Sequence, residues 1–427
     1  MYSLITILFV ASLLLRYAQR GNHPAQLGLI SAISLALIGM ATPVIWNWSR
    51  QYGSVGLLPS HYLSSSEISQ FYFLFSLLST GAILNGIVFI ILFNSRDLKS
   101  DFPSKTGLRD VRNARLIPII GALTLLLLIF GMGKSLLFNE TYLDFSGSQT
   151  FLRAANAILP ASIIALGFAC FDSKYRKLNT SLLFFIFIIQ ASRGSRISLI
   201  VPLIVFLHLA VRSVSLFRRI TFILVMILSF QILVSLTFLA RNTSSGLMKF
   251  PALFANAIET TIQVENLIPS LGRMLASISS WAPTVIASIS ESSSAVIIRN
   301  INPLIGTGTD SFAYSSAGIE RLFPYTWIPL SSLGQIYGAF GGLTVLLVAF
   351  FISAMASLSL IPSKRSSSLS IYSLLAVATY IFQFPLFFQY SSRIWIRVLW
   401  FMTLLSCLHI WNLVKFKSKL NHHLDGG

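Results

Sequence analysis

Apolar residues fill long continuous stretches of this chain, and short polar segments separate the stretches. Many of them reach the roughly 20 apolar residues that a helix needs to cross the hydrocarbon core of a bilayer. Because the apolar runs are continuous and do not alternate with period two, they predict helices and not the strands of a barrel. We therefore expect an all-α polytopic membrane protein with about eleven transmembrane helices and one large, partly helical external loop.

The expected spans are 1–15, 27–46, 70–93, 116–133, 151–171, 178–191, 197–211, 219–240, 333–357, 368–389 and 394–414. The first lacks the basic segment and cleavage site of a signal peptide, so we expect it to be retained. The sixth and seventh are short and lie close together, as two half-helices or a tight hairpin would. The chain then divides into transmembrane helices over 1–240, a large loop over 241–332, and the last three helices with a tail over 333–427, within a single membrane domain.

Composition supports a membrane protein and narrows the chemistry. Hydrophobic residues make up 55% of the chain and charged residues 10%, against about 25% charged in soluble domains. The net charge of +18 fits basic loops at a membrane surface and not a nucleic-acid partner. Cys170 and Cys407 lie in apolar segments, which predicts packed thiols, and the histidines do not cluster. We therefore expect neither a metal site nor a cofactor.

The distribution of Lys and Arg predicts the orientation. The larger share of the 31 basic residues falls in alternate loops, from 16–26 to the tail after 414, with a dense run at 96–115. Cytoplasmic loops carry such an excess, so the N-terminus is expected outside, the C-terminus inside, and 241–332 outside. Every basic residue expected outside is an arginine except Lys134 and Lys249. Arginine suits bidentate phosphate or carboxylate recognition, which favours an anionic ligand there over snorkelling of individual side chains to the interface.

The segment ASRGSR, residues 191–196, places two arginines between the sixth and seventh spans. A charged side chain inside a span is costly and commonly marks a pathway or a binding site. Gly194 and the neighbouring serines allow a tight turn that leaves both guanidinium groups available. Arg193 and Arg196 are thus candidates for binding an external anion, and contact with lipid headgroup phosphates is the competing interpretation.

The external loop carries its own pattern. Apolar residues recur at helical spacing over 271–289, with a kink expected at Pro283, and more weakly over 252–268. These segments are expected to lie on the membrane plane or to cap a cavity. The sequence RNINPLIGTGTDSFAY, residues 299–314, holds Gly306 and Gly308 in a turn that is not a nucleotide-binding loop. Further glycines open the span that follows, where close helix packing explains them as well as function does.

Taken together, these features resemble the bacterial O-antigen polymerases, the Wzy-type enzymes that join oligosaccharide repeat units. The resemblance covers about eleven spans, the SRGSR turn between two central helices, and the large external loop. Within that loop, NPLIGTGTDSF is similar to a Pro-Leu-x-Gly-x-Gly stretch shared by O-antigen polymerases and ligases, and SSLGQIYGAFGGL is similar to the family's return into the next helix. Ligases usually carry His-Asn shortly before that helix, whereas Trp327, Ile328, Pro329 and Leu330 occupy the region here, which favours a polymerase.

The resemblance implies a metal-independent glycosyltransferase of the GT-C type in the bacterial inner membrane. Its substrate would be an undecaprenyl-pyrophosphate-linked oligosaccharide on the periplasmic face, and its partners a flippase and a chain-length regulator. Arg193 and Arg196 would hold the pyrophosphate, and three further arginines of the loop are candidates for the same role, Arg241, Arg273 and Arg321.

The general base is expected among the external carboxylates, because the acceptor hydroxyl must lose a proton. Asp310 and Glu320 border the glycine turn and Arg321, and His61 is a further candidate. Capping of a turn or helix is an equally good explanation of Asp310. Two other kinds of protein are alternatives to a polymerase. One is an O-antigen ligase, and the other is a lipid-linked oligosaccharide flippase or another transporter. Transporters commonly contain two related halves, which this chain does not show.

Overall fold

Helices make up 91% of the residues that the computed structural model describes, and no strand occurs among those residues. Those residues are 1–18, 23–49, 62–93, 115–138, 146–172, 174–212, 215–242, 246–262, 268–269, 271–272, 275–276, 279–290, 294–301, 331–361, 376–377, 379–380, 387–388, 395–396 and 398–411. They belong to two compact units. Met1–Ser104 and Leu275–Gly427 form what we call the terminal unit, and Lys105–Met274 forms the central unit.

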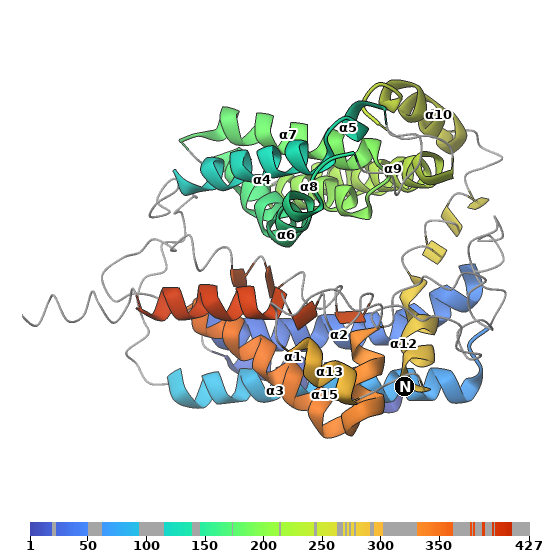
Figure 1. Cartoon of the computed structure of the whole chain (residues 1–427). Helices are drawn as coiled ribbons and strands as arrows, with labels where there is room; N and C mark the ends of the chain where they lie inside the picture. Colours follow the sequence, from blue (N-terminus) through green and yellow to red (C-terminus); the bar gives the residue numbers. More distant parts are fainter. Residues whose placement is uncertain are drawn as a thin grey trace, which may run out of the picture. The chain divides into compact units, whose positions relative to one another are not determined.

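The terminal unit contains long helices from both ends of the chain (Figure 1). Its labelled helices are α1 (Tyr2–Tyr17), α2 (His23–Ser49), α3 (Ser65–Phe93), α12 (Trp281–Ser290), α13 (Ser294–Asn300) and α15 (Ser332–Ser359). A capping box begins α3, because the Ser64 amide donates to the Glu67 carboxylate at 2.7 Å and the Glu67 amide donates to Ser64 Oγ at 3.3 Å. This local signal explains why α3 starts before its apolar run.

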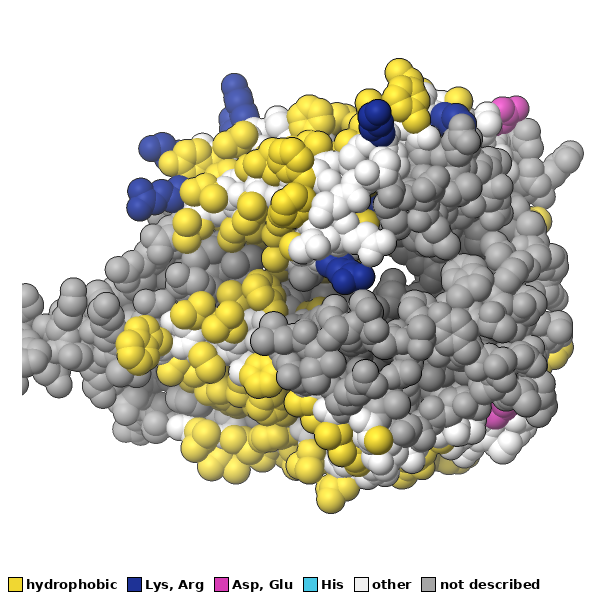
Figure 2. All heavy atoms as spheres, viewed as in Figure 1, with side chains coloured by type: hydrophobic (Ala, Val, Ile, Leu, Met, Phe, Trp, Pro, Cys, Tyr) yellow, Lys and Arg dark blue, Asp and Glu magenta, His cyan; other side chains and the backbone are white. Residues whose placement is uncertain are grey.

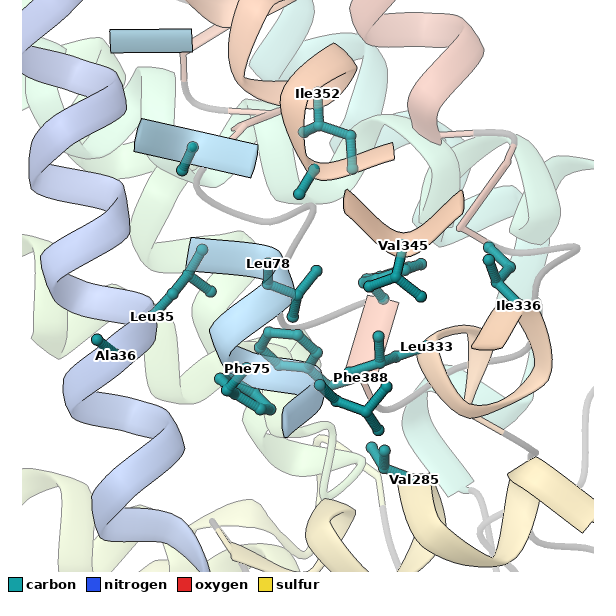
Figure 3. Close-up of a cluster of buried hydrophobic side chains, with 14 of the residues drawn as sticks. Leu35, Ala36, Phe75, Leu78, Val285, Leu333, Ile336, Val345, Ile352 and Phe388 are labelled. Atoms are coloured by element: carbon teal, nitrogen blue, oxygen red, sulfur yellow. The ribbon is translucent and has the colours of Figure 1, made fainter. Parts of the chain in front are cut away.

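One hydrophobic core joins α2, α3, α12 and α15 across more than 200 residues of sequence (Figure 3). Phe75 and Leu78 of α3 face Leu35 of α2, and Val285 of α12 lies beside the first turn of α15. The Trp281 ring stacks on Phe388 with centroids 4.8 Å apart. Close backbone approach tightens this core, because a Cβ added at Gly334 would overlap the Val285 carbonyl oxygen. Gly334 is therefore a packing residue.

Serine and asparagine side chains join helices inside the same unit. Asn85 Nδ2 donates to Ser357 Oγ at 2.9 Å, and Ser357 Oγ donates to the Pro24 carbonyl at 2.9 Å. The hydroxyls of Ser359 and Ser406 are 2.9 Å apart. Such bonds between helices stabilise packing where the surrounding medium is apolar and the hydrophobic effect gives little drive for association.

The central unit holds the SRGSR turn. Its helices, drawn from teal to yellow-green in Figure 1, are α4 (Leu116–Met132), α5 (Ser135–Phe138), α6 (Gln149–Asp172), α7 (Arg176–Ser192), the 3-10 helix η4 (Arg196–Leu199), α8 (Ile200–Arg212), α9 (Leu216–Asn242) and α10 (Phe250–Ile262). Helix α6 bends by 48° between Asn156 and Ile158. Pro160 explains the bend, since it has no N–H to donate to the carbonyl of Asn156 four residues earlier.

Several of the helices are long and apolar enough to cross a membrane, so the chain is an all-α membrane protein. By length and composition they number four among the described residues, or five if the two parts of α6 form one span. Hydrophobic side chains also cover much of the visible described surface in Figure 2. Helices occupy most of the positions expected from sequence, but α1, α4, α7 and α8 have 17 residues or fewer. The full set of eleven spans stays a prediction.

Three expectations need comment. The kink expected at Pro283 becomes an interruption at Ser280, so that Pro283 lies in the first turn of α12, where its missing N–H costs no helical bond. Cys407 is exposed and not packed, because its helix turns Met402, Ser406 and His409 inward instead. The boundaries expected at 240 and 332 separate spans from a loop, whereas the two units group residues that pack together. The units therefore do not test those boundaries, which stay a prediction.

Candidate functional site

The candidate site lies where α7 ends, at the SRGSR turn of the central unit. The Gly194 amide donates to the Ala191 carbonyl at 3.0 Å, and the Ser195 amide donates to the Gln190 carbonyl at 2.9 Å. Gly194 has a φ of 64°. This pair of bonds around a left-handed glycine is a Schellman motif, which satisfies the last carbonyls of a helix and reverses the chain. The glycine expected from sequence to allow a tight turn therefore ends α7.

The Schellman motif places Arg193 in the interior of the central unit. Arg193 occupies the C-cap position of α7 and is only 8% exposed. A guanidinium group keeps its charge at any physiological pH and has five N–H donors, so a buried one needs acceptor groups around it. An arginine that snorkels to lipid headgroups would expose its end group to water. The burial of Arg193 thus favours a binding or structural role inside the unit over snorkelling.

Two other segments meet the turn through main-chain hydrogen bonds. The Gly246 amide donates to the Ser192 carbonyl at 3.1 Å. The next amide, of Leu247, donates to the Leu136 carbonyl of α5 at 3.0 Å. The start of the 241–332 loop therefore bridges the end of α7 and the segment after α4. We expected all three segments on the same side of the membrane. These two hydrogen bonds show that the segments lie next to one another.

A buried apolar cluster packs against the end of α7 next to these main-chain hydrogen bonds. Ala191 of α7 lies in one buried cluster with Leu236 and Ala240 of α9 and with Leu253 and Ala257 of α10. Helix α10 turns back along α9, because Thr261 in its last turn contacts Ser235, with 3.2 Å between the two hydroxyl oxygens. The helical pattern expected within 252–268 is therefore a helix packed on α9 and α7.

Four polar side chains are buried inside this small region. Ser192, Ser198, Gln190 and Thr261 are at most 2% exposed. Three of them satisfy their hydroxyl groups locally, as when Ser198 Oγ donates to the Ser195 carbonyl at 2.7 Å. Gln190 was not singled out from the sequence. Its signal in the sequence is weak, an amide at the end of an apolar run, one helical turn before an arginine.

The other candidate residues are described less completely. Arg196 begins η4 and Arg241 lies in the last turn of α9, and the side chains of both are outside the described part of the structure. Outside the described residues altogether are His61, Arg273, Asp310, Glu320 and Arg321. The structure therefore brings the backbones of Arg193 and Arg196 together in one turn and does not test the remaining assignments.

Two of the external carboxylates fall in the described residues. Glu67 is used by the capping box of α3, where it also accepts from Ser64 Oγ at 2.7 Å. Glu259 is exposed on α10. Neither has the surroundings of a catalytic base, so Asp310 and Glu320 remain the candidates.

The segment that resembles the return into the ninth span begins α15. Ser331 is its N-cap, accepting from the Gly334 amide at 3.5 Å, and the Ser331 amide donates to Ser288 Oγ of α12 at 2.7 Å. Gly341 interrupts the helix with a φ of 78°. A Cβ at Gly342 would lie 2.9 Å from a methyl carbon of Leu77. Packing thus accounts for Gly342, and a helix break accounts for Gly341.

Comparisons with protein-family models, with curated proteins and with solved structures gave no match for this chain.

Proposed function

We propose that the chain is a membrane glycosyltransferase that polymerises undecaprenyl-pyrophosphate-linked oligosaccharide repeat units into O-antigen or a related surface polysaccharide. The observation that carries the proposal is Arg193, a buried cation at a helix end. A buried arginine can bind a pyrophosphate, because the planar guanidinium group donates two parallel hydrogen bonds to two phosphate oxygens. The outward excess of arginine over lysine in the sequence supports the same ligand class.

The reaction is a transfer of the growing glycan to a new repeat unit. A hydroxyl oxygen of the acceptor sugar forms a bond to the anomeric carbon of the donor. The bond from that carbon to the pyrophosphate oxygen breaks, and its electron pair leaves with the undecaprenyl pyrophosphate. The hydroxyl proton passes to a carboxylate, for which Asp310 and Glu320 are the candidates. Arg193, with Arg196 and the loop arginines Arg241, Arg273 and Arg321, stabilises the charge on the leaving group.

The proposal includes a location and partners. The enzyme is a multi-pass protein of the bacterial inner membrane with about eleven spans, and its C-terminus is cytoplasmic. The SRGSR turn and the 241–332 loop face the periplasm, where a flippase delivers the repeat unit and a chain-length regulator sets the product size. The bonds from Gly246 to Ser192 and from Leu247 to Leu136 support one shared face for these segments.

Deletion of the gene, followed by electrophoresis of the surface polysaccharide, tests the proposal. A polymerase mutant attaches a single repeat unit, so the ladder of longer chains should disappear while the single-unit band remains. Loss of all repeat units with precursor accumulating outside the membrane would indicate a ligase, and precursor accumulating inside would indicate a flippase. Either of these outcomes, or an unchanged ladder, overturns the polymerase assignment. A plasmid copy of the wild-type gene that restores the ladder is the control.

A further inference from the structure

Gln190 is a buried amide whose hydrogen-bonding capacity is incompletely used. Its residue is 2% exposed, and its Nε2 has no hydrogen-bond partner in the part of the chain that the structure describes. Burying an amide N–H without an acceptor destabilises the folded state, because the group gives up its hydrogen bonds to water. An apolar residue would avoid this cost, so the amide at this position calls for a reason other than packing.

The position of Gln190 in the Schellman motif sharpens the question. Gln190 is the residue whose carbonyl accepts from the Ser195 amide, so the two residues occupy the ends of the motif. Proteins commonly place a hydrophobic contact between these two positions. Here both are polar, and the main chain alone accounts for the turn. The side chain of Gln190 is thus available for a different purpose.

The relation between Gln190 and Arg193 indicates what that purpose is. They are three residues apart at the end of one helix, a spacing that places side chains next to each other on one face. Both the Nε2 group and the guanidinium are donors only, so a ligand that contacts both must offer several acceptor oxygens. A phosphate or pyrophosphate does so.

We infer that Gln190 is a second binding residue of the anion site, donating an Nε2–H hydrogen bond to an oxygen of the same phosphate group that Arg193 contacts. This inference rests on the proposed function, since it assigns a further ligand to that site. The inference also explains why glutamine suits this position better than lysine. A neutral donor adds a bond to the anion without placing a second buried charge beside Arg193.

Binding of inorganic pyrophosphate to the purified full-length protein in lipid nanodiscs tests the inference. Gln190→Leu removes the amide at nearly constant size, and Gln190→Glu replaces the donor with an acceptor and a negative charge. The control is Asn179→Leu, a fully buried residue on α7 eleven positions earlier, about 16 Å away along the helix. Affinity is measured by calorimetric titration, and thermal unfolding is followed in the absence of pyrophosphate.

A hydrogen bond to a charged group contributes about 1.5–3 kcal/mol, so Gln190→Leu should weaken pyrophosphate binding by about tenfold or more. Its unfolding temperature should stay the same or rise, because the unpaired amide is gone. Gln190→Glu should bind still more weakly, and Asn179→Leu should bind like the wild type. Wild-type affinity in folded Gln190→Leu, or in Gln190→Glu, overturns the inference, whatever its stability.

The Arg193→Ala variant distinguishes failure of this inference from failure of the proposed function. If Arg193→Ala loses pyrophosphate binding and Gln190→Leu keeps it, only the role of Gln190 is wrong. If Arg193→Ala also binds with wild-type affinity, the anion site itself fails, and the proposed function loses its supporting observation.

Discussion

The amide of Gly246 donates a 3.1 Å hydrogen bond to the carbonyl oxygen of Ser192, fifty-four residues earlier in the chain. Through this bond Gly246, which follows α9 in the sequence, contacts the last residue of α7, directly before Arg193. The 241–332 loop therefore starts against the candidate site and does not begin as a free tether. Helix α10, which follows at once, packs its Leu253 and Ala257 into the cluster beneath the turn.

A disulfide between Ser235 and Thr261 tests the return of α10 along α9. Their hydroxyl oxygens are 3.2 Å apart, close enough for cysteines at the two positions to bond. In a chain with Cys170 and Cys407 replaced by alanine, Ser235→Cys with Thr261→Cys should cross-link on mild oxidation. Proteolytic cleavage between the two positions followed by non-reducing electrophoresis detects the bond. Ser235→Cys with Thr260→Cys, which points to another side of α10, should cross-link far less. Equal cross-linking of the two pairs would contradict the packing.

Gly194→Ala tests the Schellman motif that ends α7. A residue with a Cβ in the left-handed conformation costs roughly 1–2 kcal/mol, so the purified protein should unfold at a lower temperature. Asparagine tolerates this conformation better than alanine, and Gly194→Asn should therefore be milder. Differential scanning fluorimetry in detergent measures both variants. A Gly194→Ala protein as stable as the wild type would show that the turn does not need a positive φ.

Much of the architecture follows from the sequence, because continuous apolar runs determine helices locally. Helices α2, α3, α9 and α15 begin and end within a few residues of the expected spans. What the sequence alone does not give is the set of contacts between distant segments. The chain Asn85–Ser357–Pro24 and the bond from Gly246 to Ser192 depend on which helices meet. Gln190 escaped notice for the same reason, since one polar residue at the end of an apolar run is ordinary until its burial and missing partner are known.

Impermeant labelling tests the orientation that the basic residues predict. Ser244→Cys and Ser104→Cys lie outside the described residues, in the large loop and in the basic 96–115 segment, which are expected outside and inside. In intact cells carrying a chain without native cysteines, a membrane-impermeant maleimide should label position 244 and not position 104. Both should react after the cells are opened, which controls for access. Labelling of 104 alone in intact cells would reverse the orientation.

Replacement of the turn arginines by lysine tests bidentate recognition. A lysine keeps the charge but offers a single ammonium in place of the planar fork, so Arg193→Lys and Arg196→Lys should lose most of the polymer at normal protein levels. Arg193→Ala should lose all of it, since contacts to a buried charge are worth several kcal/mol when removed. Polysaccharide electrophoresis measures the outcome, with immunoblots of membranes as the control for insertion. Wild-type chain lengths in Arg193→Lys would argue that the charge alone suffices.

The role of Asp310 is decided by comparing two substitutions at one position. Asp310 follows Gly306 and Gly308 in the segment that resembles the Pro-Leu-x-Gly-x-Gly stretch of polymerases and ligases, and it lies outside the described residues. A general base must accept the proton of the acceptor hydroxyl, which a carboxylate does and an amide does not. A cap needs only a side-chain oxygen, and asparagine caps about as well as aspartate. If Asp310 is the base, Asp310→Asn and Asp310→Ala should both lose the polymer at matched protein levels. Polymer retained in Asp310→Asn and lost in Asp310→Ala would assign Asp310 to the turn and leave Glu320 or His61 as the base.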